Sequence, residues 1–274
     1  MPTIEQNIQA WNSQYEWPEQ GDEWSQTWGG VASQWFGTIL SRVKSFVPAH
    51  TILEIAPGFG RWTQFLRPLC TELILVDISE KCIEACKQRF AAYQGISYHV
   101  NDGCSLAMVA DRSIDFAFSF DSLVHAEAEV LVAYFAQLAL KLQPDGIVFI
   151  HHSNLGEYVD RATGQLPPGI ENPHWRALSV SAETVREACD RNGLTCISQE
   201  LINWGGNELN DAFTVATRQN SCWTGQSIVM RNTEFMREAE YVARLAQLYD
   251  WGRWARGATS RPADALRDVT ATVV

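Results

Sequence analysis

The sequence predicts an α/β fold in which helices cover both faces of a mostly parallel sheet. Short apolar segments alternate with segments of helical periodicity over most of the 274 residues. Small or polar residues follow five of the apolar segments directly. In an open α/β sheet, ligands bind outside the carboxyl ends of the strands, so these residues are expected to line one crevice.

Seven segments are predicted as strands: residues 52–55, 72–77, 97–100, 114–120, 146–150, 195–203 and 212–218. Helical spacing of apolar side chains predicts helices at residues 33–47, 62–69, 80–93, 127–142, 182–192 and 233–249. Ser181 is expected to cap the start of the helix at 182–192, and Gly193 is expected to end it. Because most of the predicted strands alternate with helices, we expect parallel pairing for most of the sheet.

Three regions flank or interrupt this pattern. Residues 1–32 hold four of the eleven tryptophans among polar residues, and we expect them to form a cap, because exposing so many indoles to water is costly. The main domain is predicted at residues 33–218, and its Gly- and Pro-rich stretch at 155–180 is interpreted as a lid or acceptor loop. Residues 219–274 are predicted as a helical extension, loosely ordered over 256–274.

Composition excludes several classes of protein. The formal net charge of −11 disfavours a nucleic-acid partner, because no basic surface would neutralise phosphates. No apolar stretch is long enough to span a bilayer, and the N-terminus has no signal-peptide core. Seven cysteines without a C-x-x-C pair do not resemble a disulfide framework, so we expect a cytoplasmic protein. The oligomeric state is left open, a homo-oligomer included.

The stretch TILEIAPGFGRWTQFL at residues 51–66 combines a buried strand, a small-residue turn and a helix. Glycine lets a backbone approach a ligand closely, and the start of a helix presents free N–H groups, so this arrangement favours a nucleotide-type ligand. The dinucleotide fingerprint G-x-G-x-x-G fails here, because Ala56 and Arg61 occupy two of its three glycine positions. An NAD-dependent oxidoreductase is therefore disfavoured.

With the spacing E-x-A-x-G-x-G, the same stretch resembles motif I of the class I S-adenosylmethionine-dependent methyltransferases. The segments LILVD, NDG, FSFDSLVH and GIVFIHHSN resemble the later motifs of this family. The resemblance covers residues 34–218. It implies a Rossmann-like seven-stranded sheet with an antiparallel seventh strand, S-adenosyl-L-methionine as cofactor and S-adenosyl-L-homocysteine as product. The Trp-rich flanks also resemble those of bacterial methyltransferase-like proteins from polysaccharide and secondary-metabolite pathways.

The resemblance also implies roles for individual residues. The amino-acid portion of the cofactor would lie among Glu54, Ala56, Gly58 and Gly60, with Trp62 beside them. The ribose would be bound by Asp77, next to Ile78, and the adenine by Asp102 and Gly103; Asp121 would lie beside the transferred methyl group. From the residues alone, Asp77 could instead cap the next helix, and Asp102 could be a turn former.

Methyl transfer to a hydroxyl group needs a base, and histidine is the usual base near neutral pH. Three histidines follow strand ends, and we rank them as catalytic candidates in the order His152, His151, His125. Adjacent residues in a strand point in opposite directions, so at most one of His151 and His152 is expected to reach the acceptor. A buried, hydrogen-bonded histidine is the structural alternative for each.

The resulting prediction is an O-methyltransferase that acts on a small polar molecule, a sugar or glycosylated natural product, with a histidine as general base. A divalent metal held by Asp121, His125, His151 and His152 is disfavoured, because such ions prefer more oxygen ligands. Two alternatives remain. One is an N-methyltransferase that acts on an amino sugar or amine, and the other is a cofactor-binding regulatory protein without catalytic activity.

Overall fold

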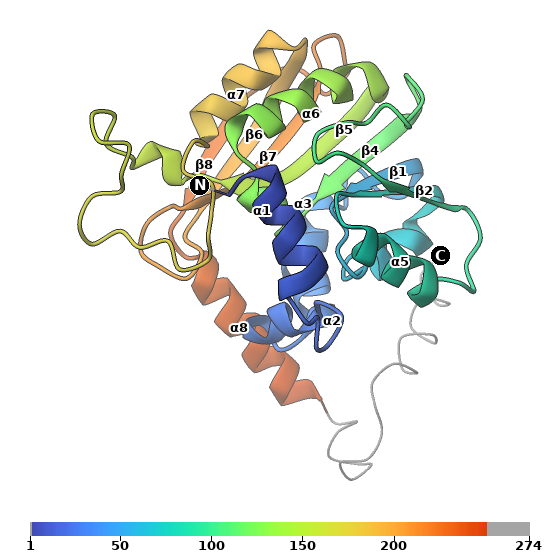
Figure 1. Ribbon diagram of the computed structural model, residues 1–274, viewed down its shortest axis with the longest axis horizontal. Helices are drawn as coiled ribbons and strands as arrows, with labels where there is room; N and C mark the ends of the chain where they lie inside the picture. Colours follow the sequence, from blue (N-terminus) through green and yellow to red (C-terminus); the bar gives the residue numbers. More distant parts are fainter. Residues whose placement is uncertain (1, 251–274) are drawn as a thin grey trace.

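The computed structural model describes residues 2–250. Its centre is one eight-stranded sheet with the strand order β3-β2-β1-β4-β5-β7-β6-β8 (Figure 1). The strands β3, β2, β1, β4 and β5 are parallel neighbours, whereas β7 runs antiparallel to both β5 and β6. The prediction of a mostly parallel Rossmann-like sheet with an antiparallel seventh strand is confirmed.

The strands are β1 (Ala49–Ile55), β2 (Cys70–Asp77), β3 (Ile96–Val100), β4 (Ile114–Ser119), β5 (Leu142–Ser153), β6 (Leu194–Ile202), β7 (Asp211–Arg218) and β8 (Ile228–Asn232). The α-helices are α1 (Ile4–Gln9), α2 (Val31–Gln34), α3 (Leu40–Val43), α4 (Thr63–Leu66), α5 (Glu80–Arg89), α6 (Ala128–Lys141), α7 (Ala182–Arg191) and α8 (Phe235–Tyr249). Shorter 3-10 and π-helical segments are η1 (Ala10–Gln14), η2 (Asp22–Trp28), η3 (Trp35–Ile39), η4 (Arg67–Leu69), η5 (Leu123–His125) and η6 (Leu155–Glu157).

The predicted count of seven strands is wrong, because β8 adds an eighth strand beside β6. This strand lies within the region predicted as a helical extension, residues 219–274. It escaped prediction because Ile228, Val229 and Met230 are consecutive, exposed apolar residues without the alternation that identifies a half-buried strand. The predicted helix at 233–249 is present as α8, and the expectation for residues 256–274 lies outside the described residues.

The two faces of the sheet carry different cores. On one face, aliphatic and small side chains such as Leu53, Ala117 and Val148 pack against α6 and α7 (Figure 1). On the other face, aromatic side chains such as Phe116 and Phe118 pack against α3, α4, α5 and α8. This separation follows from the alternation of side chains along each buried strand.

The N-terminal segment (residues 2–28) packs against the loops that follow β1 and β4. Trp17 stacks on Phe59 with ring centroids 4.4 Å apart. The side-chain amide of Asn7 donates to the carbonyl of His125 at 3.2 Å. These contacts bring residues from the start of the chain to the carboxyl ends of the central strands. A division of the chain into a cap, a main domain and an extension stays a prediction.

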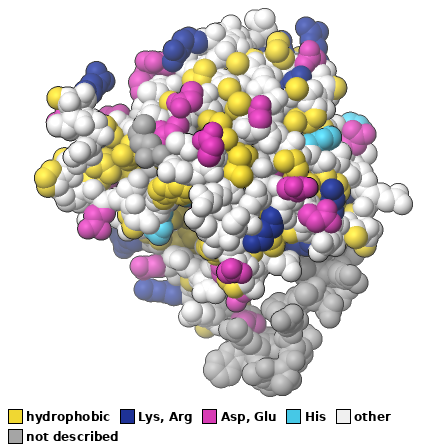
Figure 2. Space-filling view, viewed as in Figure 1, with side chains coloured by type: hydrophobic (Ala, Val, Ile, Leu, Met, Phe, Trp, Pro, Cys, Tyr) yellow, Lys and Arg dark blue, Asp and Glu magenta, His cyan; other side chains and the backbone are white. Residues whose placement is uncertain are grey.

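The surface and the thiols are consistent with the composition. Acidic side chains are scattered among apolar and basic ones on the face shown in Figure 2. Within residues 2–250, none of the helices has the length and hydrophobicity that a membrane span needs. All seven cysteines are free thiols, and burial raises the pKa of Cys82 and Cys86 well above the ordinary thiol value.

Candidate functional site

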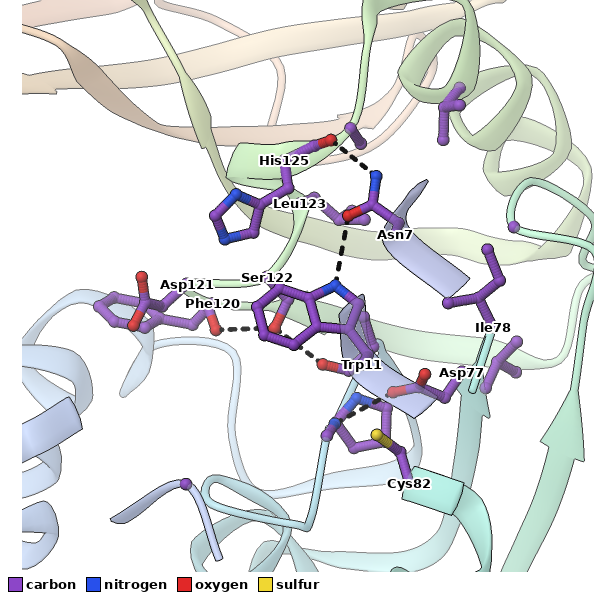
Figure 3. A pocket seen from close by; sticks show the side chains of 18 of the residues that line it. Asn7, Trp11, Asp77, Ile78, Cys82, Phe120, Asp121, Ser122, Leu123 and His125 are labelled. Atoms are coloured by element: carbon purple, nitrogen blue, oxygen red, sulfur yellow. Dashed lines mark hydrogen bonds between the residues drawn. The ribbon is translucent and has the colours of Figure 1, made fainter. Parts of the chain in front are cut away.

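A cavity lies at the carboxyl ends of β1, β2 and β4 (Figure 3). Its empty volume is about 900 Å³, space open to solvent included. Its wall comes from the loops after these strands, from the start of α6 and from the N-terminal segment. In Figure 3, Trp11 lies between the His125 side and the Asp77 side of the cavity, and its indole N–H donates to Asn7 at 3.2 Å.

The turn after β1 has two left-handed positions, which are separated by Pro57. Ala56 and Gly58 have φ angles of 57° and 58°, a region that residues other than glycine rarely adopt. Both residues line the cavity. A Cβ atom on Gly58 would come within 2.8 Å of the Trp17 ring, so glycine is needed there for close packing. The sequence predicted this turn correctly, but it gave no sign that Gly58 faces Trp17.

Asp77 ends β2, is 5% exposed and lines the cavity with Ile78. Its Oδ1 accepts from the N–H of Ser79 at 2.8 Å, and its Oδ2 accepts from the N–H of Gly58 at 3.1 Å. Burial raises the pKa of Asp77 to about 6. Asp77 does not cap the next helix, because the hydroxyl of Ser79 accepts from the N–H of Cys82 and performs that role.

Three of the predicted cofactor residues do not line the cavity. Glu54 lies beneath the turn, where Oε2 accepts from the Thr63 hydroxyl at 2.6 Å and Oε1 is buried without a partner. Burial raises the pKa of Glu54 to about 8. Gly60, with φ of 86°, packs against the Phe90 ring. Asp102 is exposed, and its Oδ1 accepts two backbone N–H groups of its own turn; the adjacent Gly103 does line the cavity.

Asp121 follows β4, is half-buried and forms an ion pair with the buried Arg61 in the wall of the cavity. Its Oδ2 lies 2.7 Å from a guanidinium nitrogen of Arg61, which is 4% exposed. The guanidinium group lies 4.5 Å from the ring centroid of Trp62 and 5.2 Å from that of Trp24. The second terminal nitrogen of Arg61 is buried and has no partner. The sequence signalled Arg61 only as a mismatch to the dinucleotide fingerprint.

His125, at the end of η5, uses one of its two ring nitrogens in a hydrogen bond. Its Nδ1 lies 3.0 Å from the carbonyl oxygen of Trp175. Since a carbonyl can only accept, Nδ1 carries the proton and Nε2 holds the lone pair. No hydrogen bond from the described residues reaches Nε2, and His125 lines the cavity. Burial lowers the pKa of His125 below its ordinary value of 6.5.

His151 and His152 are fully buried outside the cavity wall. The Nδ1 of His151 accepts from the N–H of Asp121 at 3.1 Å, and its Nε2 lies 3.1 Å from Asp211. The ring of His152 contacts the Ser153 carbonyl at 2.8 Å and the Thr214 hydroxyl at 2.7 Å, and burial lowers its pKa to about 4. The structure therefore brings only the third-ranked histidine of the sequence prediction to the cavity.

Glu127, at the start of α6, was not singled out from the sequence. It is 6% exposed and lines the cavity. One carboxylate oxygen accepts from the hydroxyl and the N–H of Ser179, and the other, Oε1, is buried without a partner. Its only sequence signal was an acid at the beginning of a predicted helix, which is a common position for acids.

The four candidate metal ligands do not converge. His151 contacts the backbone of Asp121 and the carboxylate of Asp211, while His152 points to the opposite face of the sheet, toward Thr214. Among residues 2–250, no three His, Cys, Asp or Glu side chains are grouped as a metal ion requires.

The chain is similar to known proteins in part of its sequence and in its fold. Residues 52–146 match a family model described as a methyltransferase domain. No curated protein sequence matches the chain. A solved S-adenosylmethionine-dependent methyltransferase from Clostridium acetobutylicum is similar at 14% identity, covering 69% of this chain and 92% of that one, with a TM-score of 0.51.

Two further solved structures share the fold. DhpI in complex with SAH matches at 17% identity over 79% of this chain and 97% of its own, with a TM-score of 0.52. The PH0226 protein of Pyrococcus horikoshii OT3 matches at 19% identity over 72% of this chain and 99% of its own, with a TM-score of 0.51. At these identities, the likeness concerns the fold.

Proposed function

We propose that the chain is an S-adenosyl-L-methionine-dependent methyltransferase, which the methyltransferase-domain match over residues 52–146 and the likeness of its fold to such enzymes support. We propose further that it methylates a hydroxyl group of a small polar molecule, a saccharide or glycosylated compound. His125 is the general base in this proposal. The observation that carries it is the unpartnered Nε2 of His125 in the wall of the cavity.

The residues of the cavity fit the cofactor. When bound, S-adenosyl-L-methionine supplies an electrophilic methyl group from its sulfonium. Asp77 is placed to accept hydrogen bonds from ribose hydroxyls, and Ile78 and Gly103 would border the adenine. The unpartnered guanidinium nitrogen of Arg61 would donate to the carboxylate of the amino-acid portion. Glu54, Gly60 and Asp102 do not line the cavity, so in this proposal they support the shape of its loops.

His125 is in the protonation state that a base requires. Its Nδ1–H donates to Trp175, so Nε2 could accept the proton of an acceptor hydroxyl. The oxygen would gain the methyl group as the bond from that group to the cofactor's sulfur breaks, and S-adenosyl-L-homocysteine would leave. The same Trp175 carbonyl stabilises the imidazolium that results. Because burial lowers the pKa of His125, the ring is neutral at pH 7. General-base catalysis of this kind contributes about 10²–10⁴-fold in rate.

The chemistry of the lining favours a neutral or cationic acceptor. Asp77, Asp121 and Glu127 contribute three carboxylates to the wall, against the single guanidinium of Arg61. Such a field disfavours an anionic acceptor. Trp11 adds an aromatic surface on which the apolar face of a sugar ring can stack.

A second candidate is N-methylation of an amine or amino sugar, which the unpartnered Oε1 of Glu127 favours. A buried carboxylate oxygen without a donor is costly, and a bound ammonium group would satisfy it. An amine acceptor would need Glu127 for positioning, and a deprotonating histidine would matter less.

The test is an acceptor screen with matched pairs of neutral sugars and their amino-sugar counterparts. The enzyme is incubated with S-adenosyl-L-methionine, release of S-adenosyl-L-homocysteine is measured, and the methylated position is located by NMR. We expect an O-methyl product whose formation His125→Asn slows by about 10²–10⁴-fold and Glu127→Gln retains. An N-methyl product that survives His125→Asn would support the second candidate. Methylation of neither class by protein that binds the cofactor would overturn both.

A further inference from the structure

The backbone of Asp121 has an unusual conformation and an unusual hydrogen-bond acceptor. Its φ angle is 58°, in the left-handed region that few residues other than glycine occupy. Its N–H donates to the Nδ1 of His151 at 3.1 Å, so a side chain of the neighbouring strand β5 accepts this bond. This conformation presents the Asp121 carboxylate to Arg61 in the cavity wall.

Both ring nitrogens of His151 are committed. Because Nδ1 accepts from a backbone N–H, it holds the lone pair, and the proton is on Nε2. Nε2–H therefore donates to the Oδ2 of Asp211 at 3.1 Å. Neither nitrogen is free to take a proton from an acceptor, so His151 is not a general base.

Asp211 is itself held by a buried ion pair. The Nε of Arg176 lies 2.5 Å from Oδ1, and a terminal nitrogen of Arg176 lies 2.7 Å from Oδ2. Burial alone would raise the pKa of Asp211, but Arg176 and His151 outweigh it and hold this pKa below its usual range. Asp211 thus stays ionised and keeps accepting from His151. Arg176 belongs to the 155–180 loop, so that loop is linked to the end of β4.

The ring plane of His151 is fixed by aromatic neighbours. The ring centroids of Phe120, Trp204 and Phe213 lie 5.0, 5.1 and 4.8 Å from that of the imidazole. The imidazole is fully buried, as is Asp211. A buried charged group is weak evidence for stability, since apolar packing of similar volume is often at least as stable. The arrangement therefore calls for a role beyond packing.

We propose that His151 is a positioning residue for the cofactor. Held by Asp211 and Arg176, it keeps the backbone of Asp121 in its left-handed conformation and so keeps the Asp121–Arg61 pair directed at the cofactor. This inference rests on the proposed place of Asp121 and Arg61 beside the amino-acid portion of the cofactor. It assigns to His151 an effect on cofactor binding and no proton transfer.

Two substitutions at this position separate positioning from packing. In His151→Asn, the side-chain oxygen can occupy the place of Nδ1 and still accept from the Asp121 N–H. In His151→Gln, the amide lies near the place of Nε2, so it can reach Asp211 and leaves the Asp121 N–H without an acceptor. Both variants lose the aromatic ring, so loss of packing affects both.

Calorimetric titration with S-adenosyl-L-homocysteine is the measurement, with circular dichroism to verify folding. We expect His151→Gln to weaken binding by about 10-fold or more, the cost of one unsatisfied buried donor, while His151→Asn stays within about 3-fold of the wild type. Equal weakening in both variants would reduce His151 to a packing role. Unchanged binding in both would also overturn the proposal.

A measurement on the wild type decides the matter even if His151→Gln does not fold. Long-range ¹⁵N NMR of the histidine rings, with His151 assigned from the spectrum of His151→Asn, reports the tautomer. We expect Nδ1 without a proton and Nε2 protonated, as the hydrogen bonds to the Asp121 N–H and to Asp211 require. The opposite tautomer would overturn the proposal. Neither experiment needs an acceptor, so failure of the acceptor screen and failure of this inference are distinguishable.

Discussion

The two walls of the cavity differ in how their polar atoms are used. One wall, which is proposed to hold the cofactor and which we call the cofactor wall, consists of Ala56, Gly58, Asp77, Ile78 and Gly103. Each oxygen of its single carboxylate already accepts from a backbone N–H. The other wall, which is proposed to hold the acceptor and which we call the transfer wall, consists of Asp121, Ser122, His125 and Glu127. Here the Nε2 of His125 and the Oε1 of Glu127 have no partner among the described residues.

This difference separates two tasks. A wall whose groups are held by the backbone suits a ligand that is the same in every turnover, because little rearrangement accompanies binding. Unpartnered acceptor atoms, such as the Nε2 of His125 and the Oε1 of Glu127, suit a reacting molecule, whose own donors satisfy them only when it is bound. The hydroxyl of Ser122 donates to the carbonyl of Ala56 at 2.8 Å and joins the two walls. We therefore expect substitutions in the two walls to change different kinetic quantities.

The largest effect is expected from His125→Asn in the transfer wall. Asparagine can keep the contact with the Trp175 carbonyl but has no basic atom at the place of Nε2. Turnover should fall by about 10²–10⁴-fold, while the dissociation constant of S-adenosyl-L-homocysteine stays within about 3-fold. Initial rates and calorimetry measure the two quantities. The matched control is His174→Asn, at an exposed histidine outside the cavity lining. Retained turnover in His125→Asn would remove the distinction between the walls.

The next effect is expected from Asp77→Asn in the cofactor wall. Hydrogen bonds to a charged group contribute about 1.5–3 kcal/mol, so cofactor affinity should fall by about 10–100-fold. Turnover at saturating cofactor should change little. Glu54→Gln is the control, because Glu54 is another buried acid of this region but does not line the cavity. Equal losses of affinity in both variants, measured by calorimetry, would assign the effect to the turn as a whole.

The pH dependence of turnover is a third way to test the role of His125 in the transfer wall. Only neutral His125 can act as a base, so turnover at saturating cofactor should fall as the pH decreases through the pKa of this residue. Because burial lowers that pKa, the midpoint should lie below 6.5. Below the midpoint, the rate should fall about 10-fold per pH unit. The residual activity of His125→Asn should lack this dependence. A midpoint above 6.5 in the wild type would contradict a buried, neutral base.

Local patterns predicted the fold well, because they are carried by neighbouring residues. The alternation of strands and helices located β1 to β7, and the small-residue turn after β1 located the cofactor wall. The strand β8 was missed because its five residues, four of them exposed, carry little pattern. Its pairing with β6 depends on residues about 30 positions earlier in the chain.

The roles of the histidines could not be predicted, because they depend on distant partners. The acceptor that leaves the Nε2 of His125 free is the carbonyl of Trp175, 50 residues away. The carboxylate that occupies His151 belongs to Asp211, 60 residues away. The sequence predicted all three ranked histidines to follow strand ends, so position alone could not distinguish a free nitrogen from a committed one; in the structure His151 and His152 lie within β5. Glu127 was missed because its unpartnered oxygen is a property of packing.

The smallest effect is expected at Ala56, where the family resemblance implied glycine. Ala56 and Gly58 have almost the same φ, but Ala56 carries a Cβ in this left-handed region, which costs about 1–2 kcal/mol. Glycine removes that cost but loses about 0.5–1 kcal/mol through the entropy of the unfolded chain. Ala56→Gly should therefore raise the free energy of unfolding by about 0.5–1 kcal/mol, measured by urea denaturation.

The matched control is the opposite change at Gly58, two residues further along the same turn. Gly58→Ala adds a Cβ at 2.8 Å from the Trp17 ring, so it should lower the free energy of unfolding and displace the N-terminal segment from the cofactor wall. If Ala56→Gly and Gly58→Ala both lower the free energy of unfolding, the backbone of Ala56 carries no strain in this turn. The strain would then have to be sought at Asp121, the left-handed residue of the transfer wall.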